Sequence, residues 1–405
     1  MYSQPHQFEP LLPSEAKIAP LLAKAHDLSR AAVQLASTRV PPELRGLLRS
    51  MNSYYTNRIE GQHTRPREID QALRKDFSKN VKLAAKQRLA VAHIEAELAL
   101  EQRYAPVIVT DDATSLRSLY SADRVQGMHQ ELFGRLPAQD LFTDEGEPIV
   151  PGQLRLREVR VGEHVPPTFA SVPAFLQRWA SAYGGVRRGE AALVAMACAH
   201  QRLGWLHPFV DGNGRVMRLH THTLLSAMGY TGGLWSPLRG FARSTERYYA
   251  LLADADSPRR GDLDGRGNLS EQALIAWVDY VLDVCQDQVT FMTSLLDFQA
   301  IKERIAACLV FEATVLKSGV RQESLHALHY LYLSCQEMPR GDFKAMLGMS
   351  DRGATDALGA LVKRGLLKSD SPQGKVRFGL PQHALRFMFP RLWPEAEADA
   401  AGMAS

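Results

Sequence analysis

Helical periodicity constrains this chain more than any other feature. Apolar residues recur at three- and four-residue spacing over 14–36, 42–61, 66–77 and 80–104, and again over 172–181, 189–206, 214–228, 244–255 and 270–298. This spacing places them on one face of a helix. The clearest strand-like pattern is confined to 153–165, where apolar residues alternate with a slip near Arg157 and Glu158, and where Gly162 permits a turn. The sequence therefore predicts a mainly α fold.

Composition excludes several classes of protein. A length of 405 residues allows two or three domains, and a net charge of +4 gives no strong argument for a nucleic-acid or membrane partner. The four cysteines are far apart, so we expect buried thiols in a reducing compartment, without a zinc site or disulfides. The N-terminal residues lack a secretory pattern, and the chain lacks an apolar run of about 20 residues. We expect a cytoplasmic protein that does not bind membranes.

The pattern changes from about residue 325. Three short helices are predicted over 325–335, 339–348 and 350–368, followed by a hairpin around Pro372–Gly374. This is the plan of a winged helix, whose third helix could enter a DNA groove. That helix mixes acidic with basic residues and is not strongly basic. We therefore favour a small protein-interaction or dimerisation module over specific DNA binding.

A polar, glycine-rich stretch, HPFVDGNGRVMR at 207–218, separates two apolar helical segments. A new helix is expected to start near Gly214 or Arg215. Arg215 and Arg218 then lie one turn apart at a helix end that is already positive, and they repel each other unless an anion lies between them. The uncovered amides of the glycine loop would also attract an anion, so the stretch predicts a polyphosphate site. It contains neither GxxxxGK[ST] nor a complete dinucleotide fingerprint.

Two other side chains give this site a chemistry. Asp211 would repel phosphates unless Mg²⁺ bridged carboxylate and phosphate oxygens. His207 lies at the end of the preceding helix, where a neutral imidazole could accept a proton from an incoming hydroxyl.

A second helix end has the wrong charge. Glu60, in TNRIEGQ, lies in the last turn of its predicted helix, just before the capping residue Gly61, and Thr56 lies one turn earlier. The negative end of a helix favours cations, so we expect Glu60 to meet an arginine of the phosphate loop. An exposed, slightly unfavourable glutamate is the simpler alternative.

The stretch 207–218 matches HPFx[D/E]GNGRxxR in full and resembles the signature of the Fic family, whose members transfer AMP from ATP to hydroxyl side chains of proteins. TNRIEG, at Thr56–Gly61, resembles the family's inhibitory motif, [S/T]xxxE[G/N]. GQLRLREVRVGEHVPP resembles its flap, and RYYALL its adenine-side segment. The resemblance implies a Fic helical core with a β-hairpin flap, a helical region over 1–120, a catalytic domain over 121–300, a winged helix over 301–395 and a tail over 396–405.

The resemblance also implies a role for each site residue. His207 is the general base, Asp211 holds Mg²⁺, and Arg215 and Arg218 contact the β- and γ-phosphates. Glu60 pairs with Arg218 and displaces the γ-phosphate. The remaining implied contacts are the anion hole at Gly212, Asn213 and Gly214, the flap over the nucleotide at Val161, Gly162, Glu163 and His164, and the adenine side at Tyr248 and Tyr249. The two tyrosines could equally be core residues.

Three functions stay open on this reading. The first is a protein adenylyltransferase that uses ATP and Mg²⁺, binds its target along the flap and could modify itself or form a homodimer. The second is a hydrolase that removes AMP, with Glu60 orienting water. The third is a DNA-binding regulator in which the Fic core acts as a sensor.

Overall fold

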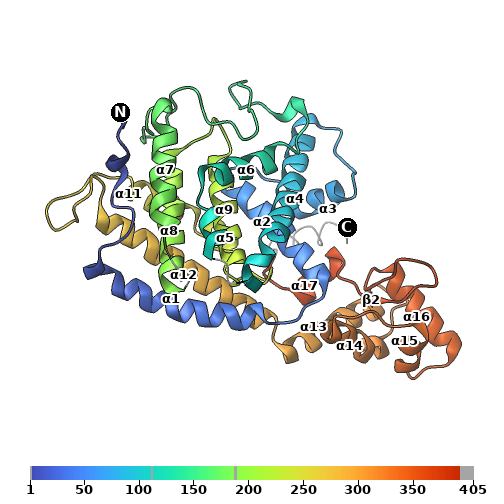
Figure 1. The fold of residues 1–405 in the computed structure, drawn as a ribbon. Coiled ribbons are helices and arrows are strands. Elements are labelled where there is room, and N and C mark those ends of the chain that lie inside the picture. Colours follow the sequence, from blue (N-terminus) through green and yellow to red (C-terminus); the bar gives the residue numbers. More distant parts are fainter. Residues whose placement is uncertain (1, 111–112, 187–188, 393–405) are drawn as a thin grey trace. The chain divides into compact units, whose positions relative to one another are not determined.

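The computed structural model describes residues 2–110, 113–186 and 189–392. The tail expected over 396–405 lies outside these residues. Helices predominate in the described chain, and its paired strands are β1 (Leu367–Lys368) and β2 (Arg377–Phe378), so the mainly α prediction is confirmed (Figure 1). Within the same residues, each helix is too short or too polar to span a membrane.

The chain divides into two compact units. The larger holds Met1–Ala36, Asn52–Thr64 and Gln71–Thr290, and the smaller holds Ser37–Met51, Arg65–Asp70 and the chain from Phe291 onward. Three helices run from one unit into the other along the chain: α2 (Pro42–Ile59), α3 (Pro66–Leu73) and α12 (Glu271–Leu295).

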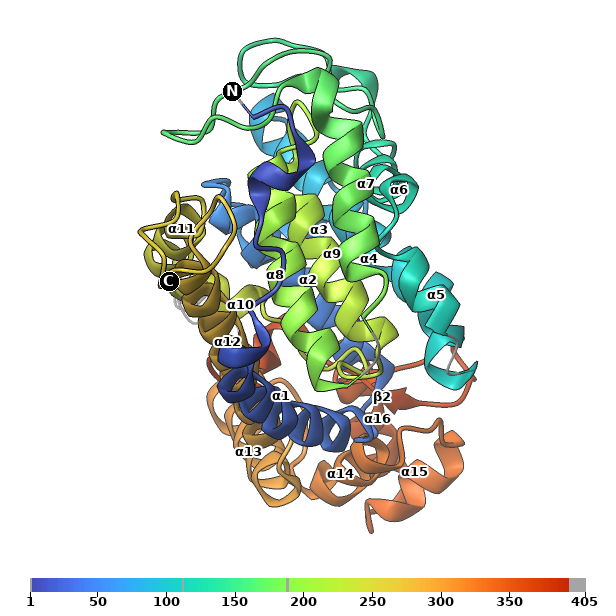
Figure 2. The same ribbon diagram turned by 60° about the vertical axis from the view of Figure 1, so that its left-hand side comes forward.

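Two helices form the centre of the larger unit. The residues of α8 (Glu190–Leu206) are apolar on nearly every face, a pattern typical of a helix surrounded by others, and most of them are buried. Beside it lies α9 (Asn213–Ala227), which also packs against α4 (Val81–Thr110) and α6 (Ala122–Phe133) (Figures 1 and 2). The other helices of this unit are α1 (Glu15–Ala36), α5 (Ala113–Ser118), α7 (Val172–Tyr183), α10 (Leu238–Arg243) and α11 (Thr245–Asp254).

The connection between α8 and α9, residues 207–212, is here named the motif loop. His207 ends α8 in the left-handed conformation, with φ +48°, and Gly212 precedes α9 with φ +78°. Such angles favour glycine and strain other residues. The sequence therefore places helix boundaries on both sides of the loop, and the loop lies at the N-terminus of a central helix.

The flap, residues 153–165, differs from its prediction. It forms no ladder, and its pairing is a single bridge between Val161 and His164 around Gly162. The buried guanidinium of Arg155 donates to the backbone carbonyls of His207, Arg157 and Pro167. Arg155 thus ties the flap to the motif loop and to the chain just beyond the flap.

The smaller unit contains the helices and the hairpin predicted from its sequence. The predicted helices are α14 (Leu325–Ser334), α15 (Arg340–Met346) and α16 (Asp351–Lys363), with β1 and β2 after α16. The unit also holds α13 (Phe298–Val310) and α17 (Leu385–Met388), which the sequence analysis did not predict. The hairpin pairs Leu367 with Phe378 and Lys368 with Arg377.

The cysteine prediction is correct in three of four cases. Cys198, Cys285 and Cys308 are buried, but Cys335 is partly exposed. Cys335 ends α14 in a left-handed conformation, where the chain turns away from the helix.

Candidate active site

Asn213 holds the motif loop closed. Its side-chain oxygen accepts from the backbone N–H of Phe209 at 2.9 Å, and its side-chain nitrogen donates to the Phe209 carbonyl at 2.9 Å. The Asn213 side chain is therefore committed to shaping the loop, so an anion there would meet backbone groups.

Two glycines of the stretch permit close approaches. A Cβ atom at Gly212 would lie 2.2 Å from the Phe133 ring, and one at Gly214 would lie 2.3 Å from Oε1 of Glu60. The Glu60 carboxylate thus lies directly against the first turn of α9. That turn attracts anions because its amide groups have no partner within the helix.

Arg218 is surrounded by the end of α2. Its Nε donates to Oγ1 of Thr56 at 2.8 Å, and its Nη2 donates to the Thr56 carbonyl at 3.2 Å and to Oε1 of Glu60 at 2.5 Å. The Arg218 side chain is 1% exposed, and that of Glu60 is 25% exposed. The structure brings Thr56, Glu60 and Arg218 together, and Arg218 is the arginine that Glu60 meets.

Arg215 has a partner that the sequence analysis missed. Its Nε donates to Oδ1 of Asn57 at 3.1 Å, and its Nη1 lies 3.9 Å from Oδ1 of Asp211. Asn57 stands beside Thr56 in the inhibitory-like stretch. A buried amide in the last turn of a helix was a usable signal, because such a group requires a hydrogen-bonding partner.

The position of Glu60 is fixed by the end of α2. The amide of Gly61 donates to the Arg58 carbonyl at 3.0 Å, and the amide of Gln62 donates to the Asn57 carbonyl at 2.9 Å. With Gly61 at φ +71°, these bonds form a Schellman cap. Glu60 is therefore the first residue beyond the helix, rather than a member of its last turn.

The Glu60–Arg218 pair is ionised on both sides. Burial alone would raise the pKa of Glu60, but Arg218 and Arg215 outweigh burial and lower it. Burial alone would lower the pKa of Arg218, but Glu60 outweighs burial and raises it. A carboxylate with a lowered pKa is an anion at neutral pH, and it occupies the place in front of the arginine.

His207 is neutral at physiological pH. Burial is the main cause that lowers its pKa to about 4, and the nearby His164 and Arg155 add to the shift. Arg155 also donates from Nε to the His207 carbonyl at 2.9 Å. Sequence analysis did not identify Arg155, whose only signal was a charged residue within an apolar alternation.

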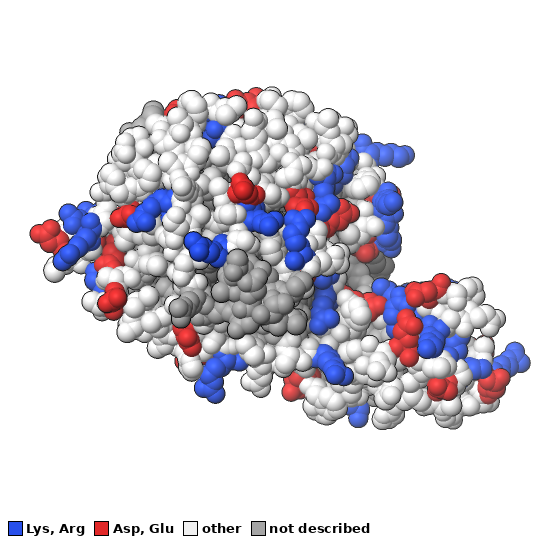
Figure 3. Space-filling model, in the orientation of Figure 1, with Lys and Arg blue, Asp and Glu red and all other residues white. Residues whose placement is uncertain are grey.

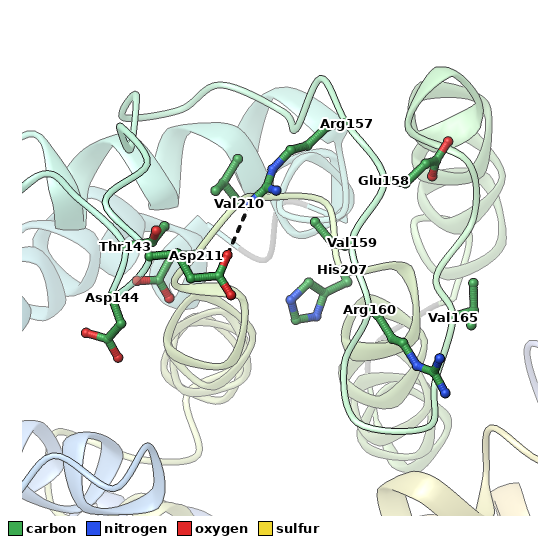
Figure 4. Close-up of a pocket in the computed structure, with 11 residues that line it drawn as sticks. Thr143, Asp144, Arg157, Glu158, Val159, Arg160, Val165, His207, Val210 and Asp211 are labelled. Carbon is green, nitrogen blue, oxygen red and sulfur yellow. Dashed lines mark ion pairs between the residues drawn. The ribbon is translucent and has the colours of Figure 1, made fainter.

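His207 and Asp211 line a cavity of about 660 Å³. Figure 4 shows both residues beside the labelled flap residues. The other lining residues are Thr143, Asp144, Glu145, Arg157, Glu158, Val159, Arg160, Val165 and Val210. The flap therefore borders this cavity through 157–160 and Val165, rather than through the predicted segment Val161–His164.

The predicted segment Val161–His164 lies elsewhere. Val161 is exposed, and the Glu163 side chain is fully exposed at the tip. His164 is instead held on the core, with Nε2 2.7 Å from the Trp205 carbonyl and Nδ1 3.6 Å from Asp256. The part of the flap that lines the cavity thus lies a few residues before the segment expected to cover the nucleotide.

A second cavity, of about 520 Å³, opens on the other side of Asp211. Glu60, Arg215, Lys82 and Lys86 line it, and Asp144 and Asp211 border both cavities. Sequence analysis did not identify the lysines or Asp144, which lie far from the motif along the chain.

The two tyrosines have different environments. Tyr248 is fully buried, with its hydroxyl 3.0 Å from Nε2 of His200, so its ring packs in the core and lines neither of the two cavities. Tyr249 is 45% exposed and donates to the Ile59 carbonyl at 3.0 Å. Tyr249 therefore tethers the end of α2 and leaves part of its ring accessible.

Comparison with known proteins agrees with this geometry. Residues 119–225 match the Fic/DOC family. Over 85 residues the chain is 40% identical to the protein adenylyltransferase Fic of Drosophila virilis and 39% identical to that of Drosophila mojavensis. Each match covers 21% of this chain, with 18% and 17% of those relatives. The chain thus spans less than a fifth of either.

The fold extends the likeness beyond the motif. A Fic family protein from Desulfovibrio desulfuricans G20 is similar over 94% of this chain and 99% of its own, with a TM-score of 0.51 and 18% sequence identity. The family match covers α6 to α9, the helices that carry the motif loop. Residues 119–225 of this chain therefore form a domain of the Fic/DOC family.

Proposed function

We propose that this chain transfers AMP from ATP to a hydroxyl side chain of a target protein, and that Glu60 restrains the reaction. One observation carries the proposal. The carboxylate of Glu60 lies on Arg218 at 2.5 Å and against Gly214, at the N-terminus of α9. An anion of the chain itself thus fills the place where helix amides and arginine favour phosphate.

The residues around the motif loop fit a magnesium nucleotide. The Asp211 side chain is 43% exposed and borders both cavities together with Asp144. Carboxylate oxygens are the ligands that Mg²⁺ prefers, so Asp211 would hold the ion. When bound, Mg²⁺ supplies positive charge against the phosphate oxygens.

His207 accepts the proton of the target hydroxyl. Its low pKa keeps the imidazole neutral and able to accept. The hydroxyl oxygen bonds to the α-phosphorus, the bond from that phosphorus to the bridging oxygen breaks, and pyrophosphate leaves. Arg215 and Arg218 would orient the phosphate chain, and positioning of this kind supplies most of the catalysis in such transfers.

The target would approach along the flap. Leu156 is 70% exposed, and Val161 and Val165 are also exposed on the same segment. Because the flap backbone is not paired in a sheet, an extended target segment can align beside it through main-chain hydrogen bonds.

The experiment that tests this function compares two positions of label. Wild type and Glu60→Gly are incubated with α-labelled ATP and, separately, with γ-labelled ATP, and labelled protein is then measured. Label should transfer from the α-labelled ATP only, and more in Glu60→Gly. Transfer of the γ label alone would show a kinase reaction and contradict the proposal.

Removal of AMP is a second candidate because Glu60 is present and ionised close to Arg218 and His207. In that reaction Glu60 would orient a water molecule toward the phosphorus of a modified target. Release of AMP from pre-modified target, lost in Glu60→Gly, would favour this candidate over transfer.

The smaller unit is proposed as a protein-interaction module rather than a DNA reader. Lys344 pairs with Asp351 at 2.7 Å, and Arg364 donates to buried Glu312 at 2.7 Å through both Nε and Nη2. On the face seen in Figure 3, positive and negative side chains are interspersed over this unit. DNA binding that weakens steeply with added salt would favour the opposite view.

A further inference from the structure

A cluster of polar side chains lies inside the larger unit, one helical turn beyond Arg218. Glu97 and Glu101 come from α4 and His222 comes from α9, and one donor atom of each lies within 4.8 Å of the others. Nε2 of His222 is 3.0 Å from Oε1 of Glu101 and 3.5 Å from Oε1 of Glu97. The cluster is separate from Asp211 and plays no part in the proposed transfer.

The helices dictate this juxtaposition. Glu97 and Glu101 are four residues apart, so both carboxylates lie on one face of α4. The neighbouring helix α9 packs against α4 and brings His222 opposite them. The side chains of Glu97 and His222 are 0% and 2% exposed, and that of Glu101 is 12% exposed, so the cluster is buried with one carboxylate at its rim.

His93 supplies an independent indication that the cluster holds a ligand. It is fully buried one turn before Glu97, and its Nδ1 faces Oε2 of Glu97 at 3.9 Å. Within the described chain, neither ring nitrogen of His93 has a hydrogen-bond partner. Buried polar groups are normally satisfied, so an unpartnered polar ring that faces the Glu97 carboxylate indicates that something beyond the described side chains completes the cluster.

The donor atoms define the chemical class of that ligand. Two carboxylates and an imidazole suit divalent transition metals such as Zn²⁺ and Mn²⁺. Ligands about 2.0–2.1 Å from a tetrahedral ion lie roughly 3.3 Å from each other, close to the separations of 3.0 and 3.5 Å around His222. A dication would also balance two carboxylates taken out of water, which is costly without compensation.

The surroundings of Glu97 resemble the outer contacts of a metal site. Nδ2 of Asn52, from α2, donates to Oε1 of Glu97 at 2.8 Å. Partners of this kind orient a ligating carboxylate and strengthen binding.

We propose that Glu97, Glu101 and His222 bind one divalent transition-metal ion that ties α4 to α9 below the phosphate site. His222 lies four residues after Arg218 on α9, and Asn52 lies on α2, which ends just before Glu60. The ion would therefore stabilise the helices that carry both the arginine and the inhibitory-like glutamate.

The test uses the whole chain without nucleotide. Protein stripped with a chelator is titrated with Zn²⁺, Mn²⁺ and Co²⁺ by calorimetry, and Co²⁺ binding is also followed by its visible absorption bands. We expect one equivalent of at least one of these ions and a higher melting temperature at saturation. Glu101→Gln, which keeps the side-chain shape at the rim, and His222→Ala should lose this equivalent, and Asn52→Ala should bind about tenfold more weakly or worse.

Two control variants test whether metal binding is specific to this cluster. Glu95→Gln removes an exposed carboxylate from the same helix and should keep the full equivalent. Asp211→Asn should also keep it, because the proposed magnesium position is a different site. The proposal is overturned if wild type binds none of the three ions, if Glu101→Gln with native circular dichroism still binds one equivalent, or if Asp211→Asn alone abolishes binding.

Discussion

The motif loop and the flap both border the cavity at His207, but they are held in opposite ways. In the motif loop, the side chain of Asn213 fixes the backbone of Phe209 by two hydrogen bonds, and Gly212 sits against a buried ring. The flap has one bridge of its own and is attached to the core through two side chains, Arg155 and His164. The residues proposed to carry out the transfer thus lie on the more tightly held side of the cavity, and the residues proposed to contact the target lie on the less tightly held flap.

This difference explains why the motif loop could be predicted from the sequence and the structure of the flap could not. Around the motif loop, His207 has a left-handed backbone angle, Gly212 leaves no room for a Cβ atom, and Asn213 makes buried hydrogen bonds. The flap tip is exposed at Val161 and Glu163, where many side chains would be accommodated. The following predictions test whether function and stability divide between the two segments in the same way.

The largest effect is expected for His207→Ala in a Glu60→Gly background. Loss of a general base lowers the rate of AMP transfer by about 10²–10⁴-fold, while ATP affinity measured by calorimetry should change little. His26→Ala, which removes an exposed histidine of α1, is the control. A near-normal initial rate in His207→Ala would remove this residue from the mechanism.

A smaller effect is expected for Glu60→Gly alone. A charge-assisted pair is worth roughly 1.5–3 kcal/mol, and freeing Arg218 should raise the initial rate of transfer by about tenfold or more. Asp76→Gly removes an exposed carboxylate elsewhere and should match wild type.

Fresh target and pre-modified target separate the two roles open to Glu60. An unchanged initial rate on fresh target, with slower release of AMP from modified target, would assign Glu60 to removal rather than to inhibition.

The helices and the motif loop could be predicted because local sequence determines them. The apolar run 190–206, the angle-permissive Gly212 and the doubled arginines all lie within one stretch. The charge pattern predicted that Glu60 meets an arginine of the phosphate loop, because both charges lie at helix ends that disfavour them, but only the family resemblance identified Arg218 as that arginine.

Other features depend on packing that no local pattern shows. Asn57 meets Arg215 across a separation of 158 residues, and the donors of the proposed metal cluster lie on helices more than 100 residues apart. Tyr248 and Tyr249 are adjacent, yet one is buried and the other is 45% exposed. A short family match could not distinguish these two environments.

A pair of glycine variants compares the stability of the two segments. Gly212 and Gly162 both have positive φ, +78° and +58°, so alanine should cost about 1–2 kcal/mol at either position. Only Gly212→Ala adds a clash with Phe133, and overpacking of this kind costs roughly a further 1–3 kcal/mol. Thermal unfolding should therefore show the larger loss for Gly212→Ala. Equal losses would mean that the motif loop is as adaptable as the flap.

The smallest effect concerns the pH dependence of the reaction, and it follows from the burial of His207 in the motif loop. A general base is active when deprotonated, and burial lowers the pKa of His207 to about 4. The profile of kcat/KM for Glu60→Gly, which reports the free enzyme, should stay nearly flat between pH 6 and 8 and fall only as the pH approaches 4.

An unperturbed histidine, with a pKa of about 6.5, would instead lose roughly fourfold between pH 8 and pH 6. The two profiles are distinguishable from initial rates in buffers of constant ionic strength, with circular dichroism confirming that the protein stays folded. The variant Arg155→Met tests the cause of the shift directly, because Arg155 is one of the groups that lower the pKa of His207. Arg155 also anchors the flap. A fall beginning near pH 6.5 in Glu60→Gly itself would show that His207 is solvated in the working enzyme. The rigid, desolvated motif loop would then not be the conformation that reacts.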